Sequence, residues 1–145
     1  MVSLKKFMTE RGYTRIPLTR TKTNHFEVFA KINGIEGRFI LDTGASSTCV
    51  GFDSASLFQL SPEDTELKAS GAGARGMETK IAKKNQISLQ SWKKKNVSIL
   101  LFNMFHVNAA LAEFNAIPVN GIIGADILKK GKAIIDYDKK CLYLK

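Results

Sequence analysis

The chain has 145 residues, of which 44% are hydrophobic and 24% charged, a size and composition that suit one folded domain and exclude a disordered protein. No apolar run is long enough to cross a membrane, and the first ten residues lack the features of a secretory signal peptide. Two cysteines are too few for a disulfide framework, so the expected compartment is cytoplasmic, and the formal net charge of +9 is the unusual feature.

Residues 1–12 predict a short helix that precedes the main body of the chain. Ser3 is a suitable N-cap, apolar side chains share one face, and Gly12 is a suitable C-terminal end. We therefore divide the chain into an N-terminal helical extension, residues 1–12, and a single domain, residues 13–145.

From residue 13 onward, the pattern is typical of short strands joined by turns. Residues 26–32 alternate apolar and polar side chains, Asn33-Gly34 is a strong signal for a two-residue hairpin, and residues 37–41 form the return strand. Many short strands and only brief helices predict a mostly β barrel or sandwich. The further expected elements are a short helix at residues 53–60, strands at 86–89 and 97–102, a strand that leads into a short helix at 120–128, and a closing hairpin at 132–144.

Asp42-Thr43-Gly44-Ala45 is the motif best suited to carry chemistry. Asp-Thr-Gly alone is a weak signal, but here an apolar strand, residues 39–41, leads the carboxylate into a turn of small residues. A carboxylate at the end of a buried strand must be hydrogen-bonded or be functional. On these residues alone, two interpretations stay open: an Asx-turn that only stabilises the bend, and a catalytic carboxylate.

Two later segments follow this motif along the chain. Residues 70–76, Ser-Gly-Ala-Gly-Ala-Arg-Gly, suit a hairpin tip, and residues 120–126, Asn-Gly-Ile-Ile-Gly-Ala-Asp, form an apolar step into a helix. In these three elements and in the closing hairpin, the sequence resembles the retropepsin-like, single-domain aspartic proteases. The resemblance extends from about residue 25 to residue 145.

The resemblance implies a closed-barrel-like acid protease fold with a flap hairpin over the substrate and short helices after the Asp-Thr-Gly loop and after Ile-Ile-Gly. It implies an aspartic endopeptidase, a hydrolase that uses no cofactor and no metal. The residues that it assigns are the catalytic Asp42; the active-site loop residues Thr43, Gly44, Ala45 and Ser46; the flap and substrate-binding residues Gly71, Ala72, Gly73 and Ala74; and the supporting residues Ile123 and Gly124.

In this family, two carboxylates share one proton and hold the water that attacks the peptide bond. The chain has a single Asp-Thr-Gly, and Asp126, Asp136 and Asp138 do not lie in turns of small residues. A complete pair of carboxylates therefore requires two copies of Asp42 related by a twofold axis. The resemblance thus predicts a homodimer that acts on an extended peptide or protein, with no membrane partner.

Two alternatives to a protease stay open. A catalytically silent peptide-binding or scaffolding module would have the same fold, but its Asp42 would never meet a second copy. A nucleic-acid-binding domain is suggested by residues 67–110, which hold eight basic residues and one acidic residue. No known nucleic-acid motif accompanies this charge, so we rank this alternative last.

The other conspicuous side chains are expected to be structural. His25 and His106 lack metal-ligand spacing and are assigned to the surface or to caps, and both cysteines are assigned as buried free thiols. Asp126 is expected to cap the helix that follows it or to pair with Arg38 or another basic residue.

Overall fold

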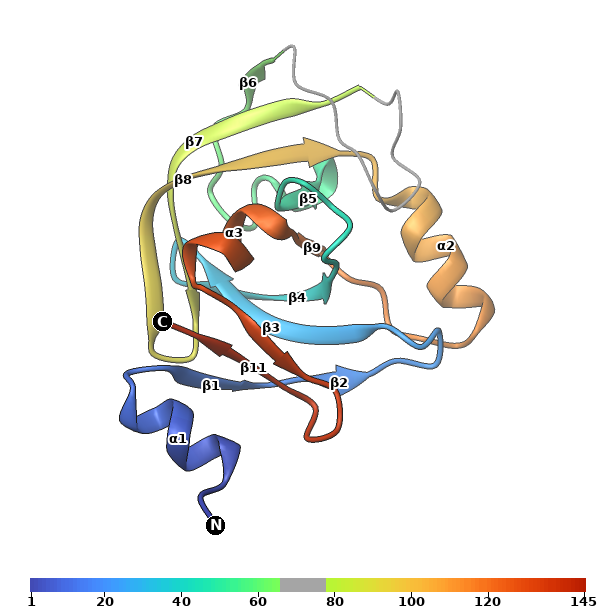
Figure 1. The fold of residues 1–145 in the computed structure, drawn as a ribbon. Coiled ribbons are helices and arrows are strands. Elements are labelled where there is room, and N and C mark those ends of the chain that lie inside the picture. Colours follow the sequence, from blue (N-terminus) through green and yellow to red (C-terminus); the bar gives the residue numbers. More distant parts are fainter. Residues whose placement is uncertain (66–77) are drawn as a thin grey trace.

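Strands dominate the computed structural model, which describes residues 1–65 and 78–145 (Figure 1). The strands are β1 (Thr14–Pro17), β2 (Thr19–Arg20), β3 (Phe26–Ile32), β4 (Ile35–Leu41), β5 (Cys49–Gly51), β6 (Glu63–Asp64), β7 (Lys80–Leu89), β8 (Trp92–Phe102), β9 (Gly121–Ile123), β10 (Ile134–Asp136) and β11 (Cys141–Leu144). The helices are α1 (Leu4–Glu10), α2 (Phe105–Glu113), α3 (Ala125–Lys130) and the 3-10 helix η1 (Phe52–Ser54).

The larger of the two sheets closes into a barrel. Its strands are hydrogen-bonded in the order β2-β3-β4-β9-β5-β8-β7-β6, and a further pairing of β3 with β7 joins the inner six into a ring. The main core lies within this ring and includes the fully buried Phe39, Phe58 and Ile123. The expected mostly β closed barrel is therefore confirmed.

The hairpin between β3 and β4 forms at the predicted turn. Asn33 and Gly34 have φ values of 52° and 83°, the left-handed values that such a two-residue turn requires. The register of the hairpin places Leu41, at the end of β4, opposite Phe26, at the start of β3. This turn therefore determines where β4 ends and where Asp42 emerges.

The chain termini form a smaller unit beside the barrel, in which α1 precedes the three-stranded sheet β1-β11-β10 (Figure 1). Ser3 caps α1 as predicted, because its Oγ accepts a hydrogen bond from the Lys6 N–H at 3.1 Å. Met8 is buried against β11, whereas the other apolar side chains of the helix are exposed. The predicted apolar face thus contributes one side chain to the core, and the domain boundary after residue 12 stays a prediction.

α2 is the main element that the sequence pattern did not predict. Its apolar residues do not form one stripe, since Phe105 is exposed and Leu111 is buried, so no helical period marks the segment. Asn103 Oδ1 accepts a hydrogen bond from the Phe105 N–H at 2.8 Å, which stabilises the start of the helix.

Three further boundaries differ from those expected. β8 begins at Trp92 and not at residue 97, because its pairing with β7 continues to Leu89 and Trp92. β7 begins at Lys80 and not at residue 86, because β-bulges between Ala82 and Ile87 interrupt the alternation of its side chains. The helix expected at residues 53–60 forms only the short η1. The expected flap tip, residues 71–74, lies outside the described residues. No helix in the two described ranges has the length and apolar character needed to cross a membrane.

Candidate active site

Asp42 follows β4 directly, at the point where the parallel strand β9 also ends. Its N–H donates a hydrogen bond to the Ile123 carbonyl, with an N–O distance of 3.0 Å, so the barrel still holds the backbone beyond the strand. Leu41 before it is buried, whereas Asp42 is partly exposed. A buried strand therefore delivers this carboxylate to an accessible position.

Two hydrogen bonds close the turn after Asp42. The Gly44 N–H donates to Asp42 Oδ1 at 2.8 Å, and the Ala45 N–H donates to the Asp42 carbonyl at 3.2 Å. Thr43 and Gly44 are exposed, whereas Ala45 is buried. The Asx-turn expected under the structural interpretation is therefore present. Since the same carboxylate also lines two pockets, the turn does not exclude a chemical role.

Gly124 and its neighbour support this loop from behind. The Ala125 N–H donates to the Ala45 carbonyl at 2.7 Å. A Cβ on Gly124 would lie 2.7 Å from the Ala45 carbonyl oxygen and 2.9 Å from backbone atoms of Ser47, distances that real side chains do not adopt. Glycine at this position is therefore what allows β9 and α3 to pack directly against the loop.

Thr48 and Asp126 connect the far end of the loop to α3. Asp126 Oδ1 accepts hydrogen bonds from the Thr48 N–H at 2.9 Å and from the Thr48 hydroxyl at 2.7 Å. The same hydroxyl oxygen accepts the Gly124 N–H at 3.0 Å. Asp126 is structural, as expected, but both specific expectations are wrong. The N-cap of α3 is Gly124, with Asp126 inside the first turn, and Arg38 forms its ion pair with Glu27.

Cys49 lies just beyond Thr48 and is a buried free thiol, as is Cys141. Burial, followed by the negative charges of Asp126 and Asp42, raises the pKa of the Cys49 thiol from 9.0 to about 12. The thiol therefore stays protonated at neutral pH and is not an activated nucleophile. Within the described ranges, no three His, Cys, Asp or Glu side chains gather so that they could hold a metal ion.

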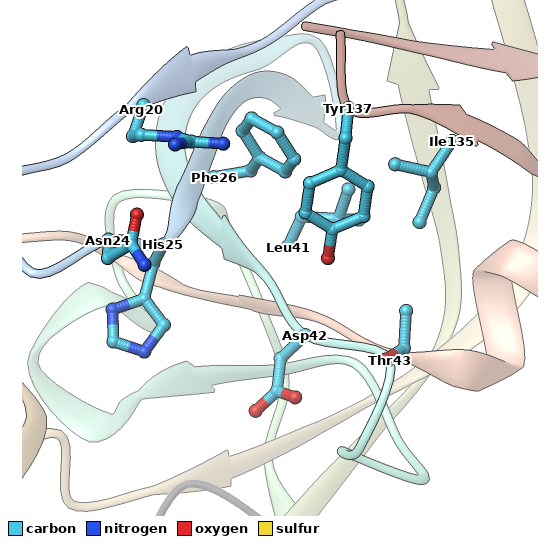
Figure 2. A pocket seen from close by; sticks show the side chains of 9 residues that line it. All are labelled: Arg20, Asn24, His25, Phe26, Leu41, Asp42, Thr43, Ile135 and Tyr137. Atoms are coloured by element: carbon cyan, nitrogen blue, oxygen red, sulfur yellow. The ribbon is translucent and has the colours of Figure 1, made fainter.

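The first pocket beside Asp42, which we call the Arg20 pocket, has a volume of about 220 Å³. Figure 2 shows its side chains: aromatic and aliphatic groups lie between a basic and amide-bearing side and the Asp42 loop. Its lining residues are Arg20, Asn24, His25, Phe26, Leu41, Asp42, Thr43, Ile135 and Tyr137.

The second pocket, which we call the α2 pocket, has a volume of about 230 Å³ and a largely aliphatic lining. Of the described residues, Asp42 and His25 alone line both this pocket and the Arg20 pocket, so these two side chains lie where the pockets meet. Its lining residues are Thr23, His25, Ile40, Asp42, His106, Val107, Ala110, Leu111 and Ile122.

Comparison with known proteins identifies the family to which this arrangement belongs. Residues 28–127, more than half of the chain, match the family model described as aspartyl protease. The chain belongs to the aspartyl protease family. A search of curated protein sequences found no match.

Solved structures of aspartyl proteases and related domains have the same fold. A retropepsin-like aspartic protease from Rickettsia conorii is 20% identical, with a TM-score of 0.57 and 91% of each chain covered. The retroviral protease-like domain of Ddi1 from Leishmania major is 16% identical, with a TM-score of 0.55 and coverage of 83% of this chain and 88% of that one. EIAV protease, solved with the inhibitor HBY-793, is 21% identical, with a TM-score of 0.50 and coverage of 83% and 92%. The fold of this aspartyl protease family member is therefore retropepsin-like.

Residues that the sequence analysis did not assign to a site complete the pockets of this family member. His25 and His106, far apart in the chain, both line the α2 pocket, although their spacing carried no signal. Arg20 and Tyr137 reach the Arg20 pocket from the ends of β2 and β10. No motif or spacing pointed to these residues, because β2 and β10 lie far from the Asp42 loop along the chain and approach it only in the folded protein.

Proposed function

We propose that this protein is an aspartic endopeptidase that hydrolyses peptide bonds as a homodimer, with one Asp42 carboxylate from each subunit. The observation that carries the proposal is the position of Asp42. Its carboxylate lies where two pockets meet, and it is the only acidic side chain among the described residues that line either pocket. Because one carboxylate is half of the required pair, a second copy of the chain has to supply the other.

The chemistry follows from two carboxylates that share one proton. Because two adjacent negative charges repel each other, the pair retains one proton, so one carboxyl group is protonated while the other is ionised. One carboxylate accepts a proton from a water molecule, whose oxygen attacks the peptide carbonyl carbon, while the protonated partner donates to the carbonyl oxygen. Collapse of the tetrahedral intermediate breaks the C–N bond, and a proton passes to the leaving nitrogen.

The loop residues have distinct proposed roles. The exposed Thr43 hydroxyl hydrogen-bonds across the dimer and keeps the two loops aligned, and the exposed Gly44 offers its carbonyl to the substrate backbone. The Ala45 carbonyl accepts the Ala125 N–H and so fixes the loop, and Ser46 borders the cleft. Ile123 and Gly124 support the loop from behind. The proposed substrate-covering role of residues 71–74 stays a prediction.

Hydrolysis of a degenerate peptide library from about pH 4 to pH 7 tests the proposed chemistry. We expect Asp42→Asn to reduce cleavage by at least about 10³-fold, because it removes the group that exchanges protons with the water and the carbonyl. Asp138→Asn is the matched control, since Asp138 is exposed and pairs only with its neighbour Lys139 among the described residues. Activity retained by Asp42→Asn would overturn the assignment of Asp42.

Sedimentation tests the second half of the proposal, the homodimer. A protein that remains monomeric at every accessible concentration and pH has no pair of carboxylates, which would favour a silent peptide-binding module. Salt-dependent retention of DNA or RNA that survives Asp42→Asn would favour the nucleic-acid alternative instead. The proposal expects a dimer in the same concentration range in which cleavage is observed.

A further inference from the structure

We infer that the Arg20 pocket binds the carboxylate of an acidic side chain, so that the protein selects peptides with Glu or Asp close to the cleaved bond. This inference rests on the proposed function and names the substrate class of the same site. It depends on three features of the pocket: its hydrogen-bond donors, the positive charge of Arg20, which forms no ion pair within the described residues, and its contrast with the α2 pocket.

The walls of the Arg20 pocket combine an apolar base with a set of donors. Phe26, Leu41 and Ile135 supply apolar surface against which the methylene groups of a side chain can pack. The remaining lining residues, apart from the Asp42 loop, all carry N–H or O–H groups: Arg20, Asn24, His25 and Tyr137. A ligand with a short apolar stem and an end that accepts several hydrogen bonds matches this arrangement.

Arg20 supplies a fixed positive charge at this pocket. Pairing of β2 with β3 places it opposite Phe26, and its guanidinium lies 5.5 Å from the centre of the Phe26 ring. Its side chain forms none of the ion pairs found among the described residues, whereas Arg38 is paired with Glu27. The Arg20 charge is therefore available to a ligand, and a guanidinium binds a carboxylate with two parallel hydrogen bonds.

The neighbouring donors are held in place by local structure. His25 Nδ1 lies 2.9 Å from Thr23 Oγ1, which orients the imidazole ring. The Tyr137 ring lies 4.9 Å from the Phe26 ring, and in Figure 2 its hydroxyl is directed toward Asp42. Asn24 has a φ of 65°, in a turn closed by its N–H and the Thr21 carbonyl at 3.0 Å.

The balance of charge at the dimeric site favours an anionic ligand. The two Asp42 carboxylates of the proposed dimer share one proton and thus carry one negative charge between them. The two Arg20 side chains carry two positive charges, which exceed that single negative charge. An acidic side chain therefore enters a site of net positive charge.

The α2 pocket has no Arg or Lys among its described lining residues, so we expect it to bind a different kind of peptide side chain. Ile40, Val107, Leu111 and Ile122 line it, and the basic residues of its lining are His25 and His106. An apolar side chain fits this surface better than a charged one. The preferred substrate hence combines an acidic and an apolar side chain around the cleaved bond.

The test uses short peptides that bind without being cleaved. Their central amide is replaced by a hydroxyethylene group, which has no C–N bond to hydrolyse, and both ends are blocked so that the only carboxylate is on a side chain. Glu, Gln or Leu is placed at each position in turn, and dissociation constants are measured at one fixed pH with the wild-type protein. A further peptide has no acidic side chain but a free C-terminus. Its dissociation constant shows whether the pocket binds a C-terminal carboxylate instead of a side-chain carboxylate.

Variants of Arg20 locate the effect. We expect Glu to bind about five- to tenfold more tightly than Gln at one or more positions. In Arg20→Met, the ratio of the Gln-peptide to the Glu-peptide dissociation constant falls close to one. Arg20→Lys restores part of the preference, because the positive charge returns without the planar guanidinium donors. Arg11→Met is the matched control, since Arg11 ends α1, lines neither pocket, and its loss changes the net charge equally.

Three outcomes would overturn the inference: no position prefers Glu to Gln, Arg20→Met leaves the ratio unchanged, or only the free chain terminus improves binding. Parallel cleavage assays on the corresponding amide peptides separate this inference from the proposed function. Cleavage without a Glu preference rejects the acidic subsite and leaves the endopeptidase intact. An Arg20-dependent Glu preference without cleavage supports the subsite and rejects the endopeptidase.

Discussion

Two walls border Asp42, and they are built in different ways. The loop wall, residues 42–48 with the supporting β9 and the start of α3, is held by backbone hydrogen bonds such as Asp42 to Ile123 and Ala125 to Ala45. The helix wall, α2, lines its pocket with the side chains of His106, Val107, Ala110 and Leu111, and of the helix residues only Leu111 is buried.

This difference matches the two tasks of the proposed protease site. In the proposed mechanism the Asp42 carboxylate exchanges protons and has to be placed accurately, and the loop wall holds it through main-chain hydrogen bonds that tolerate little change. Recognition of a side chain depends on the surface presented, and a helix at the surface can change its exposed residues at little cost to folding. We therefore expect substitutions in the loop wall to affect stability and chemistry together, and those in the helix wall to affect mainly selectivity.

The largest effect on the loop wall is expected from Gly124→Ala. The added Cβ would overlap with the Ala45 carbonyl oxygen, so we expect a loss of about 3 kcal/mol in the free energy of unfolding, measured by urea denaturation. The comparison is Gly34→Asn, where no atom of the described residues lies within 4 Å of a Cβ, so that its smaller expected loss comes from the positive φ of 83° alone. Equal losses in the two variants would show that the close packing behind the loop is not what stabilises it.

Thr48→Val breaks the connection from the loop wall to α3 while keeping the shape of the side chain. The buried Gly124 N–H and Asp126 both lose the Thr48 hydroxyl, which we expect to cost about 2 kcal/mol in unfolding free energy. Thr48→Ser keeps the hydroxyl, so its unfolding free energy should decrease less than that of Thr48→Val. If Ser and Val are equally destabilising, the methyl group and not the hydrogen bonds holds the loop.

Alkaline pH is expected to destabilise the protein through Cys49, behind the loop wall. Folding raises the pKa of this thiol to about 12, so its contribution to stability is complete below about pH 9 and is lost as the pH rises toward about 12. Over this range the wild-type protein should lose up to about 1.4 kcal/mol per pH unit relative to Cys49→Ala. Parallel stability curves for the two proteins between pH 9 and 11 would contradict the prediction.

The smallest effect is expected from the helix wall. Val107→Thr keeps the shape of a half-buried side chain of the α2 pocket but adds a hydroxyl. We expect the preference for Leu over Ser in the peptide residue that occupies this pocket to fall about threefold in kcat/KM, with the unfolding free energy changed by less than about 1 kcal/mol. Val2→Thr, outside the pockets, should change neither quantity.

The elements that the sequence predicted well are those defined by neighbouring residues. Ser3 and Lys6 cap α1 within one turn, and Asn33 and Gly34 form their hairpin with conformations that few other residue pairs adopt. The Asp42 turn is equally local, since Gly44 donates to the carboxylate two residues before it. In each case the interacting groups lie a few residues apart, so the pattern is visible in one short segment.

The elements that the sequence did not predict depend on contacts between distant segments. The bulges of β7 and the irregular apolar pattern of α2 hide their secondary structure, because their burial is set by the neighbours against which they pack. The Thr48–Asp126 hydrogen bond joins segments that are 78 residues apart, and His25 and His106, which line the same pocket, are also far apart in the chain. No spacing rule records such pairs, whose proximity follows from the strand order of the barrel.

The sequence by itself therefore determined the β-rich class, the local turns, the helix cap and the single Asp-Thr-Gly from which we propose a homodimer. Only the tertiary structure decided which side chains surround Asp42, and it placed Arg20 on one side, α2 on the other and His25 where the two pockets meet. The physical reason is that a turn is stabilised by interactions within a few residues. A pocket exists only after the barrel has closed, when strands far apart in the chain bring their ends to one edge.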